Sequence, residues 1–409
     1  MGGKAFNTHH PEAQFPRMIP SIYNDTKSKL HSILATLYTR VAVPPEAPEK
    51  VDHGDVDFIV LGPKENLTHE EVSQALGAHW SISGIPLSNY AIPFEEMGEE
   101  DSNAYIQVDV RVCEDEAEWD RVYFFSSYGD LGMILGLVAR GVGLSYGSSG
   151  LRLANPVPIH PPNMVFYLTT SVPDILKFFG WSLDGWERGF TTQMECFEWV
   201  ASSPYFDPSK MPACHAENGP SRQKTVAARG MYSAFLQFCR EQTASQRLDG
   251  ASYKRISQAE GVEAALRTFG KWELYCRMMH VEDVKKYVKR IFKGTLVTEW
   301  TGVKGTPVRW LMDEIQKRLE QSAPSEVRDN FIRTMEVDGV DPAYVTLELW
   351  QVVMREMDLE ELRALTVQVK EEMDKEGRLF YDARAAIEAR KQKKALRQAA
   401  VAAGAQTAV

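Results

Sequence analysis

The stretch VDHGDVDFIV, residues 51–60, places two aspartates on a segment that otherwise has the composition of a buried strand. Because successive side chains of a strand point to opposite faces, Asp55 and Asp57 share one face. A second stretch, AYIQVDVRV at residues 104–112, has the same period of two and carries Asp109 on its polar face. If these two strands pair, three carboxylates converge on one point.

Carboxylates held this close together repel one another, so they stay ionised only when cations neutralise them. Oxygen ligands of this kind suit Mg²⁺ or Mn²⁺, and two such ions can clamp a triphosphate and an attacking hydroxyl. We therefore expect Asp55 and Asp57 to bridge two metal ions. Asp109 would hold the ion that binds the nucleophile and would help to remove its proton. For the DxD pair alone, a solvated strand edge is the alternative interpretation.

The surrounding sequence predicts an α+β fold, with an N-terminal α/β domain followed by a mostly α-helical C-terminal region. Apolar residues recur at helical spacing over about residues 21–40, and the proline-rich VPPEAPEK at 43–50 ends that helix. Thr68, with Glu71 three residues later, forms a capping box that opens a helix between the two strands. Strand, helix and strand at this spacing are typical of a compact α/β unit.

The bulk properties are those of a globular protein of two or three domains. The chain has 409 residues, a net charge of -10 and five scattered cysteines with no CxxC pair. It contains no apolar run of the roughly 18 residues that a membrane span needs, and its N-terminus lacks the layout of a signal peptide. We expect free thiols, no membrane partner and an intracellular location, cytoplasmic or nuclear.

These motifs resemble those of the DNA polymerase β-like nucleotidyltransferase superfamily. GGKAF (2–6) resembles its glycine turn, HGDVDFIV its paired-aspartate strand and YIQVDVRV its third-carboxylate strand. The segment SYGDLGMILGLVARGVGLSYGSSGLRL (127–153) is similar to one in viral and phage members. The resemblance covers about residues 1–165, and Gly3 precedes Asp55 by 52 positions, which an inserted helix and proline joint would accommodate.

The resemblance implies transfer of a nucleoside monophosphate from an NTP, such as ATP, to an acceptor hydroxyl, with pyrophosphate leaving. It implies that Gly2 and Gly3 contact phosphate, and that the three aspartates hold two Mg²⁺ or Mn²⁺ ions. Lys4 would hold a phosphate if the glycine turn forms, and a solvated lysine is the alternative. The implied domains are a catalytic domain at 1–165, a helical extension at 166–215 and a helical acceptor-binding domain at 216–409.

A glycine-rich stretch, GVGLSYGSSG at 141–150, offers backbone N–H groups and the hydroxyls of Ser148 and Ser149 to a nucleotide. It lacks the GK[ST] ending of a P-loop, which argues against an ATPase of that class. A plain tight turn is the alternative. Arg111 and Arg152 are candidate triphosphate partners because of their positions, and no histidine or cysteine pair has zinc-ligand spacing.

The acceptor is suggested by a basic helical stripe in VEDVKKYVKRIFKG (281–294), which would attract a phosphate backbone; a solvated face of an amphipathic helix is the alternative. Nearby tryptophans in TEWTGVKGTPVRW (298–310) would offer stacking surfaces to bases, although core positions are the alternative. We expect template-independent addition to an RNA 3′-end. A small molecule or a protein hydroxyl as acceptor, and a non-catalytic binding module of the same fold, are the alternatives. The stripe consists of Lys285, Lys286, Lys289, Arg290 and Lys293.

Overall fold

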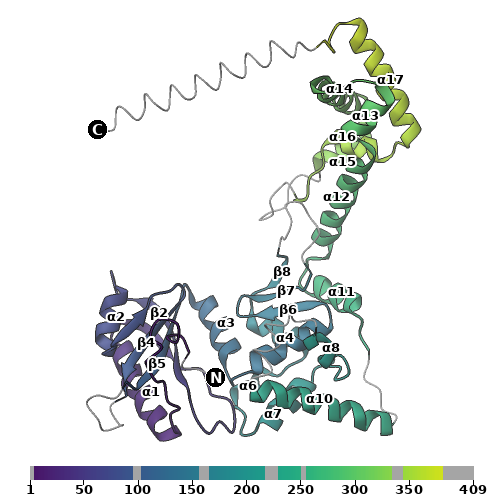
Figure 1. Cartoon of the computed structure of the whole chain (residues 1–409). Helices are drawn as coiled ribbons and strands as arrows, with labels where there is room; N and C mark the ends of the chain where they lie inside the picture. Colours follow the sequence, from purple (N-terminus) through teal and green to yellow (C-terminus); the bar gives the residue numbers. More distant parts are fainter. Residues whose placement is uncertain are drawn as a thin grey trace, which may run out of the picture. The chain divides into compact units, whose positions relative to one another are not determined.

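The computed structural model describes residues 4–94, 103–155, 165–216, 229–249, 255–333 and 344–380. These residues form two compact units (Figure 1). The first unit comprises the described residues up to Trp272, and the second comprises those from Glu273 onward. The predicted boundaries at 165/166 and 215/216 both fall inside the first unit, so the structural division lies later in the chain.

A five-stranded mixed sheet forms the N-terminal part of the first unit, with the strand order β1-β2-β5-β4-β3. The central strands β2 and β5 are parallel, and the remaining pairs are antiparallel. The α+β class expected from the sequence is confirmed in these terms. The strands are β1 (Tyr38–Ala42), β2 (Asp55–Pro63), β3 (Trp80–Ile82), β4 (Leu87–Pro93) and β5 (Tyr105–Cys113).

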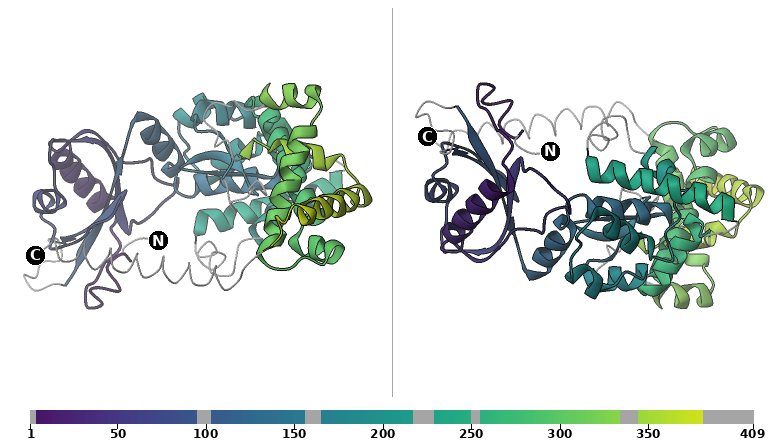
Figure 2. Two further views of the ribbon diagram at one scale, coloured as in Figure 1. Left: turned by 90° about the horizontal axis from the view of Figure 1, so that it is seen from above. Right: turned by 90° about the horizontal axis from the view of Figure 1, so that it is seen from below.

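Helices α1 (Pro20–Leu34) and α2 (His69–Leu76) cover one face of this sheet (Figure 2). The period-two pattern explains why, because Val56, Phe58 and Val60 all point to that face and are buried there. The predicted capping box at Thr68 is present and begins α2. One face of the sheet is therefore an apolar core, and the aspartates lie on the other.

Among the described residues, two segments pack on the aspartate face of the sheet. At one end the N-terminal segment buries Phe6 against Ala91 and Tyr105. At the other end α3 (Glu116–Ser126) packs Trp119 on Ile59. The carboxylates lie between these two covers.

Several elements differ from the expectations. The helix expected over residues 21–40 ends at Leu34, and residues 38–42 form β1 instead. Tyr38 and Arg40 pair with β2, so hydrogen bonding to the sheet overrides the local helical spacing. Strands β3 and β4 and helix α3 were not expected. The stretch 141–150 contains a hairpin, because Ser148 and Ser149 connect two antiparallel strands there.

The rest of the first unit surrounds α4 (Leu131–Gly141), which is buried along most of its length. No single helix in the described ranges is long and apolar enough to cross a membrane; α3 and α4 reach that length and composition only as a pair bent by 93°. The remaining strands form an antiparallel sheet in the order β6 (Leu144–Gly147), β7 (Gly150–Leu153) and β8 (Tyr167–Thr169). The remaining helices are α5 (Val172–Phe179), α6 (Leu183–Glu187), α7 (Gln193–Ala201), α8 (Met211–Ala216), α10 (Gly230–Asp249) and α11 (Gln258–Thr268).

The second unit is helical where it is described. Its long helix α12 (Trp272–Ile291) buries Val284 and Val288 in the core of this unit, as the amphipathic pattern predicts. Of the basic stripe, Lys285 is half-buried and the other four side chains are exposed. The remaining helices are α13 (Gly294–Thr301), α14 (Thr306–Ser322), α15 (Ser325–Arg333), α16 (Leu349–Arg355) and α17 (Leu359–Lys375).

Candidate metal centre

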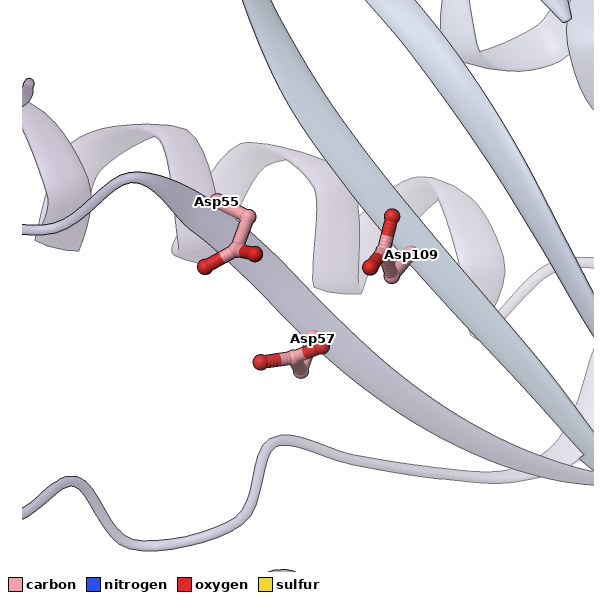
Figure 3. A group of neighbouring side chains, drawn as sticks. All are labelled: Asp55, Asp57 and Asp109. Atoms are coloured by element: carbon pink, nitrogen blue, oxygen red, sulfur yellow. The ribbon is translucent and has the colours of Figure 1, made fainter. Parts of the chain in front are cut away.

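Three carboxylates meet on the open face of the mixed sheet. Asp55 and Asp57 project from β2, and Asp109 lies directly opposite Asp57 on the parallel strand β5. One carboxylate oxygen of each aspartate lies within 4.8 Å of the other two. Figure 3 shows the three side chains on the same side of the two strands, with the helix behind the sheet on the far side. The predicted convergence of the carboxylates is therefore present.

Asp109 is oriented by two side-chain amides. Its Oδ1 accepts a hydrogen bond from Asn89 Nδ2 at 2.7 Å and from Gln107 Nε2 at 2.9 Å. The Gln107 Oε1 in turn accepts a hydrogen bond from the Ala5 backbone N–H at 2.9 Å. The two amide contacts hold one oxygen of Asp109 in place. The hydrogen bond from Ala5 brings the N-terminal segment to the edge of the carboxylate group.

The electrostatic environment favours the neutral forms of these acids. Burial raises the pKa of Asp57, and the carboxylates of Asp55 and Asp109 raise it further. Burial followed by the charge of Asp109 raises the pKa of Asp55. Burial also raises the pKa of Asp109, although its hydrogen bonds to Asn89 and Gln107 oppose that shift. A bound cation would reverse this balance, because it stabilises the ionised carboxylates.

The donor set fits a hard divalent cation. All three ligands are carboxylate oxygens, which suit Mg²⁺ or Mn²⁺ better than softer metals. Within the described part of the chain, this is the one group of three or more acidic, histidine or cysteine side chains close enough to share a metal ion. The chemistry and spacing of these residues are thus suited to binding a divalent metal ion.

A cavity of about 700 Å³ lies in front of the carboxylates. Its walls include residues 44–52, which follow β1, together with Arg229 at the start of α10. Seven carboxylates and four basic side chains line this cavity. Each basic side chain pairs with an acid: Arg17 with Asp52 at 2.6 Å, Lys50 with Glu46, Arg111 with Glu118 at 3.2 Å, and Arg229 with Asp130 at 2.7 Å.

The wall at 44–52 is held in place from both sides. Glu46 accepts a hydrogen bond from the Tyr23 hydroxyl of α1, and His53 stacks on the Tyr23 ring with centroids 3.7 Å apart. On the other side, the Pro45 carbonyl accepts a hydrogen bond from the Tyr128 N–H at 2.6 Å. The proline-rich stretch therefore forms a fixed wall of the metal cavity.

The other predicted site residues do not all lie at the carboxylates. Arg111 lines the carboxylate cavity, where it pairs with Glu118. Ser148, Ser149 and Arg152 do not; they line a second cavity, against β6 and β7. The sequence could not show this because it does not reveal which cavity the hairpin faces. Gly2 and Gly3 lie outside the described residues, and Lys4 is exposed.

Two residues of the centre were missed by the sequence analysis. The i, i+2 rule predicts that Gln107 shares a face with Asp109, but it does not reveal that Gln107 donates a hydrogen bond to that carboxylate. Asn89 could not be predicted, because its strand was not expected and its pairing with β5 joins residues twenty positions apart.

No family model matches the chain, and no curated protein matches it in sequence. Among solved structures, the chain is similar to Leishmania infantum polymerase beta in a ternary gap complex, with 13% sequence identity and a TM-score of 0.26. The match covers 34% of this chain and 52% of the polymerase, so the chain spans about half the length of that structure. At this TM-score the match carries no weight, and the interpretation of the site rests on its residues.

Proposed function

We propose that this chain is a metal-dependent nucleotidyltransferase that moves a nucleoside monophosphate from an NTP to an acceptor hydroxyl. The observation that supports this most directly is the group of three aspartates on adjacent parallel strands, with oxygens within 4.8 Å. Repulsion within this group is relieved only by protons or cations. A cavity large enough for a nucleotide opens in front of it.

In this proposal Asp55 and Asp57 would hold two divalent ions, and Asp109 would hold one of them. When bound, the ions neutralise the triphosphate and lower the pKa of the attacking hydroxyl. The acceptor oxygen forms a bond to the α-phosphorus, the bond to pyrophosphate breaks, and the hydroxyl proton passes to a carboxylate oxygen of Asp109 or to water. Asn89 and Gln107 keep that carboxylate in position through its other oxygen.

The acceptor we favour is an RNA 3′-end. The exposed basic side chains Lys286, Lys289 and Arg290 of α12 support this choice, because they suit a phosphate backbone. A small molecule or a protein hydroxyl is the alternative, and the position of the transferred label separates the two.

The test is label transfer from NTPs radiolabelled at the α-phosphate, with Mg²⁺ or Mn²⁺ and either RNA or protein as acceptor. Asp57→Asn and Asp109→Asn should each lower transfer at least about 100-fold, because loss of a metal ligand costs at least as much as loss of its outer-shell partner. The control is Asp120→Asn, an exposed aspartate of α3 that lines none of the described cavities. Transfer that survives both site substitutions would refute the mechanism.

A further inference from the structure

A second cavity, of about 800 Å³, lies against α4 and the antiparallel sheet of β6, β7 and β8. Phe125 and Met133 line both this cavity and the one that contains the carboxylates, so the two adjoin. Its size is that of a pocket for one small ligand. The metal chemistry proposed above does not use it.

A row of three different side chains crosses this sheet. Ser145 of β6 lies opposite Arg152 of β7, and Arg152 lies opposite Tyr167 of β8. The pairing of β7 with β8 is irregular between Leu151 and Arg152, and all three of these side chains line the cavity. The residues on either side, Leu151 and Leu153, are buried. A hydroxyl, a guanidinium and an aromatic ring are thus presented side by side.

The charge of this cavity is opposite to that of the metal cavity. Its described lining contains two basic side chains, Arg140 and Arg152, and no carboxylate. In the described part of the chain the Arg152 side chain has no hydrogen-bond or ion-pair partner, unlike each basic side chain at the metal centre. A guanidinium whose planar N–H donors have no partner is suited to bind a phosphate with two hydrogen bonds.

The ring of Tyr167 is the second recognition element. It is 44% exposed, which is unusual for a large aromatic side chain in this unit, and it lies next to Arg152 across the strands. An exposed ring beside a phosphate-binding arginine provides a stacking surface for a base. The hydroxyl of Ser145 and the serines of the hairpin turn add hydrogen-bonding groups that suit a ribose or a base edge.

We propose that this cavity binds one nucleotide of the acceptor strand, with its phosphate on Arg152 and its base on Tyr167. The proposal rests on the proposed function, because it assigns an acceptor to the same enzyme. Binding of this nucleotide needs no metal ion, since arginines supply the positive charge. The cavity would then hold an RNA end beside the carboxylates that act on it.

The test is fluorescence anisotropy of a labelled hexa-adenylate RNA on the full-length chain in EDTA. Arg152→Gln should weaken binding about tenfold through loss of the phosphate contact, and Arg152→Lys should fall between this variant and the wild type. Tyr167→Ala should weaken binding at least about fivefold through loss of stacking. Arg188→Gln, which removes an exposed arginine that lines none of the described cavities, should leave affinity within about twofold.

Competition separates a nucleotide site from a simple anion site. AMP should displace the labelled RNA at lower concentration than inorganic phosphate does. Unchanged binding by both Arg152→Gln and Tyr167→Ala, with melting temperatures equal to wild type, would overturn the proposal. Equal competition by AMP and phosphate would overturn the base contact.

Label transfer distinguishes an error in the proposed acceptor site from an error in the proposed nucleotidyltransferase function. Asp57→Asn is expected to bind the hexa-adenylate as the wild type does, while it transfers no label. If label transfer requires the aspartates but RNA binding is unchanged by Arg152→Gln, the proposed acceptor site is wrong. The proposed nucleotidyltransferase function is then still supported. If no acceptor is labelled at all, the proposed function itself is wrong.

Discussion

Asp55 and Asp57 lie on an otherwise apolar strand because, in our account, they form a metal-binding group with Asp109 of the neighbouring strand. Their mutual repulsion disfavours the folded, metal-free chain, and their raised pKa values express that cost. A raised pKa in the folded state means that the folded chain holds the proton more tightly than the unfolded chain does. Stability is therefore greatest below the unfolded pKa and is lost as the pH rises through the folded pKa.

Asp57→Asn should stabilise the metal-free protein while it abolishes activity. The amide cannot ionise, so the variant avoids the repulsion that grows as the pH rises. In EDTA we expect its melting temperature to match wild type at about pH 4 and to exceed it by at least about 2 °C at about pH 8. The exposed Asp120→Asn should show no such divergence. A variant no more stable than wild type at the higher pH would contradict this account.

Asn89→Ala should weaken the metal centre without removing a metal ligand. The change removes the 2.7 Å hydrogen bond to Asp109 Oδ1 and leaves Gln107 alone to orient the carboxylate, so its position is less well fixed. We expect the Mn²⁺ concentration for half-maximal activity to rise about 10- to 100-fold. Asn24→Ala on the exposed side of α1 is the matched control. An unchanged metal requirement would mean that Asn89 does not position Asp109.

At the level of secondary structure, the sequence predicted what short-range periodicity determines. The i, i+2 rule placed Asp55 with Asp57, and the capping box at Thr68 began α2 where expected. Long-range pairing could not be predicted in the same way. The helical pattern was expected to reach residue 40, yet residues 38–42 form β1, and the strand that carries Asn89 is defined by its partner β5.

Gly143, between α4 and β6, should tolerate alanine less well than Gly77 does. Both have positive φ, +78° and +68°, so alanine is strained at each position. At Gly143 an added Cβ would also lie 2.8 Å from Val262 and 3.0 Å from the Gln258 carbonyl, whereas at Gly77 nothing lies within 4 Å. In urea unfolding we expect Gly143→Ala to lose about 1 kcal/mol or more beyond the loss from Gly77→Ala. Equal losses would contradict this close packing against α11.

In our account, acidic and basic side chains of the whole molecule lie at different functional surfaces. The chain carries a net charge of -10, and the cavity at the metal centre is lined by more acids than bases. Among the described residues, exposed basic side chains gather on one side of α12, and the second cavity is lined by two arginines and no carboxylate. An acidic chain with local basic surfaces would repel nucleic acid generally and bind it at those surfaces.

Lys289→Glu should therefore weaken binding of a long RNA. We expect the affinity to fall several-fold at low salt, and the slope of log affinity against log salt to decrease in magnitude by about 1. Lys375→Glu, an exposed lysine at the end of α17, makes the same change in net charge away from the stripe. If the two variants bind equally well, the basic stripe of α12 is only a solvated helix face.

The central claim, that three aspartates hold divalent metal ions for nucleotidyl transfer, is tested most directly by counting bound Mn²⁺. Electron paramagnetic resonance of the full-length chain with a non-hydrolysable NTP should detect two bound ions per chain. Asp57→Asn and Asp109→Asn should each lose at least one of them, and Asp120→Asn should lose none. Wild-type protein that binds no Mn²⁺, or site variants that retain the full count, would contradict the account.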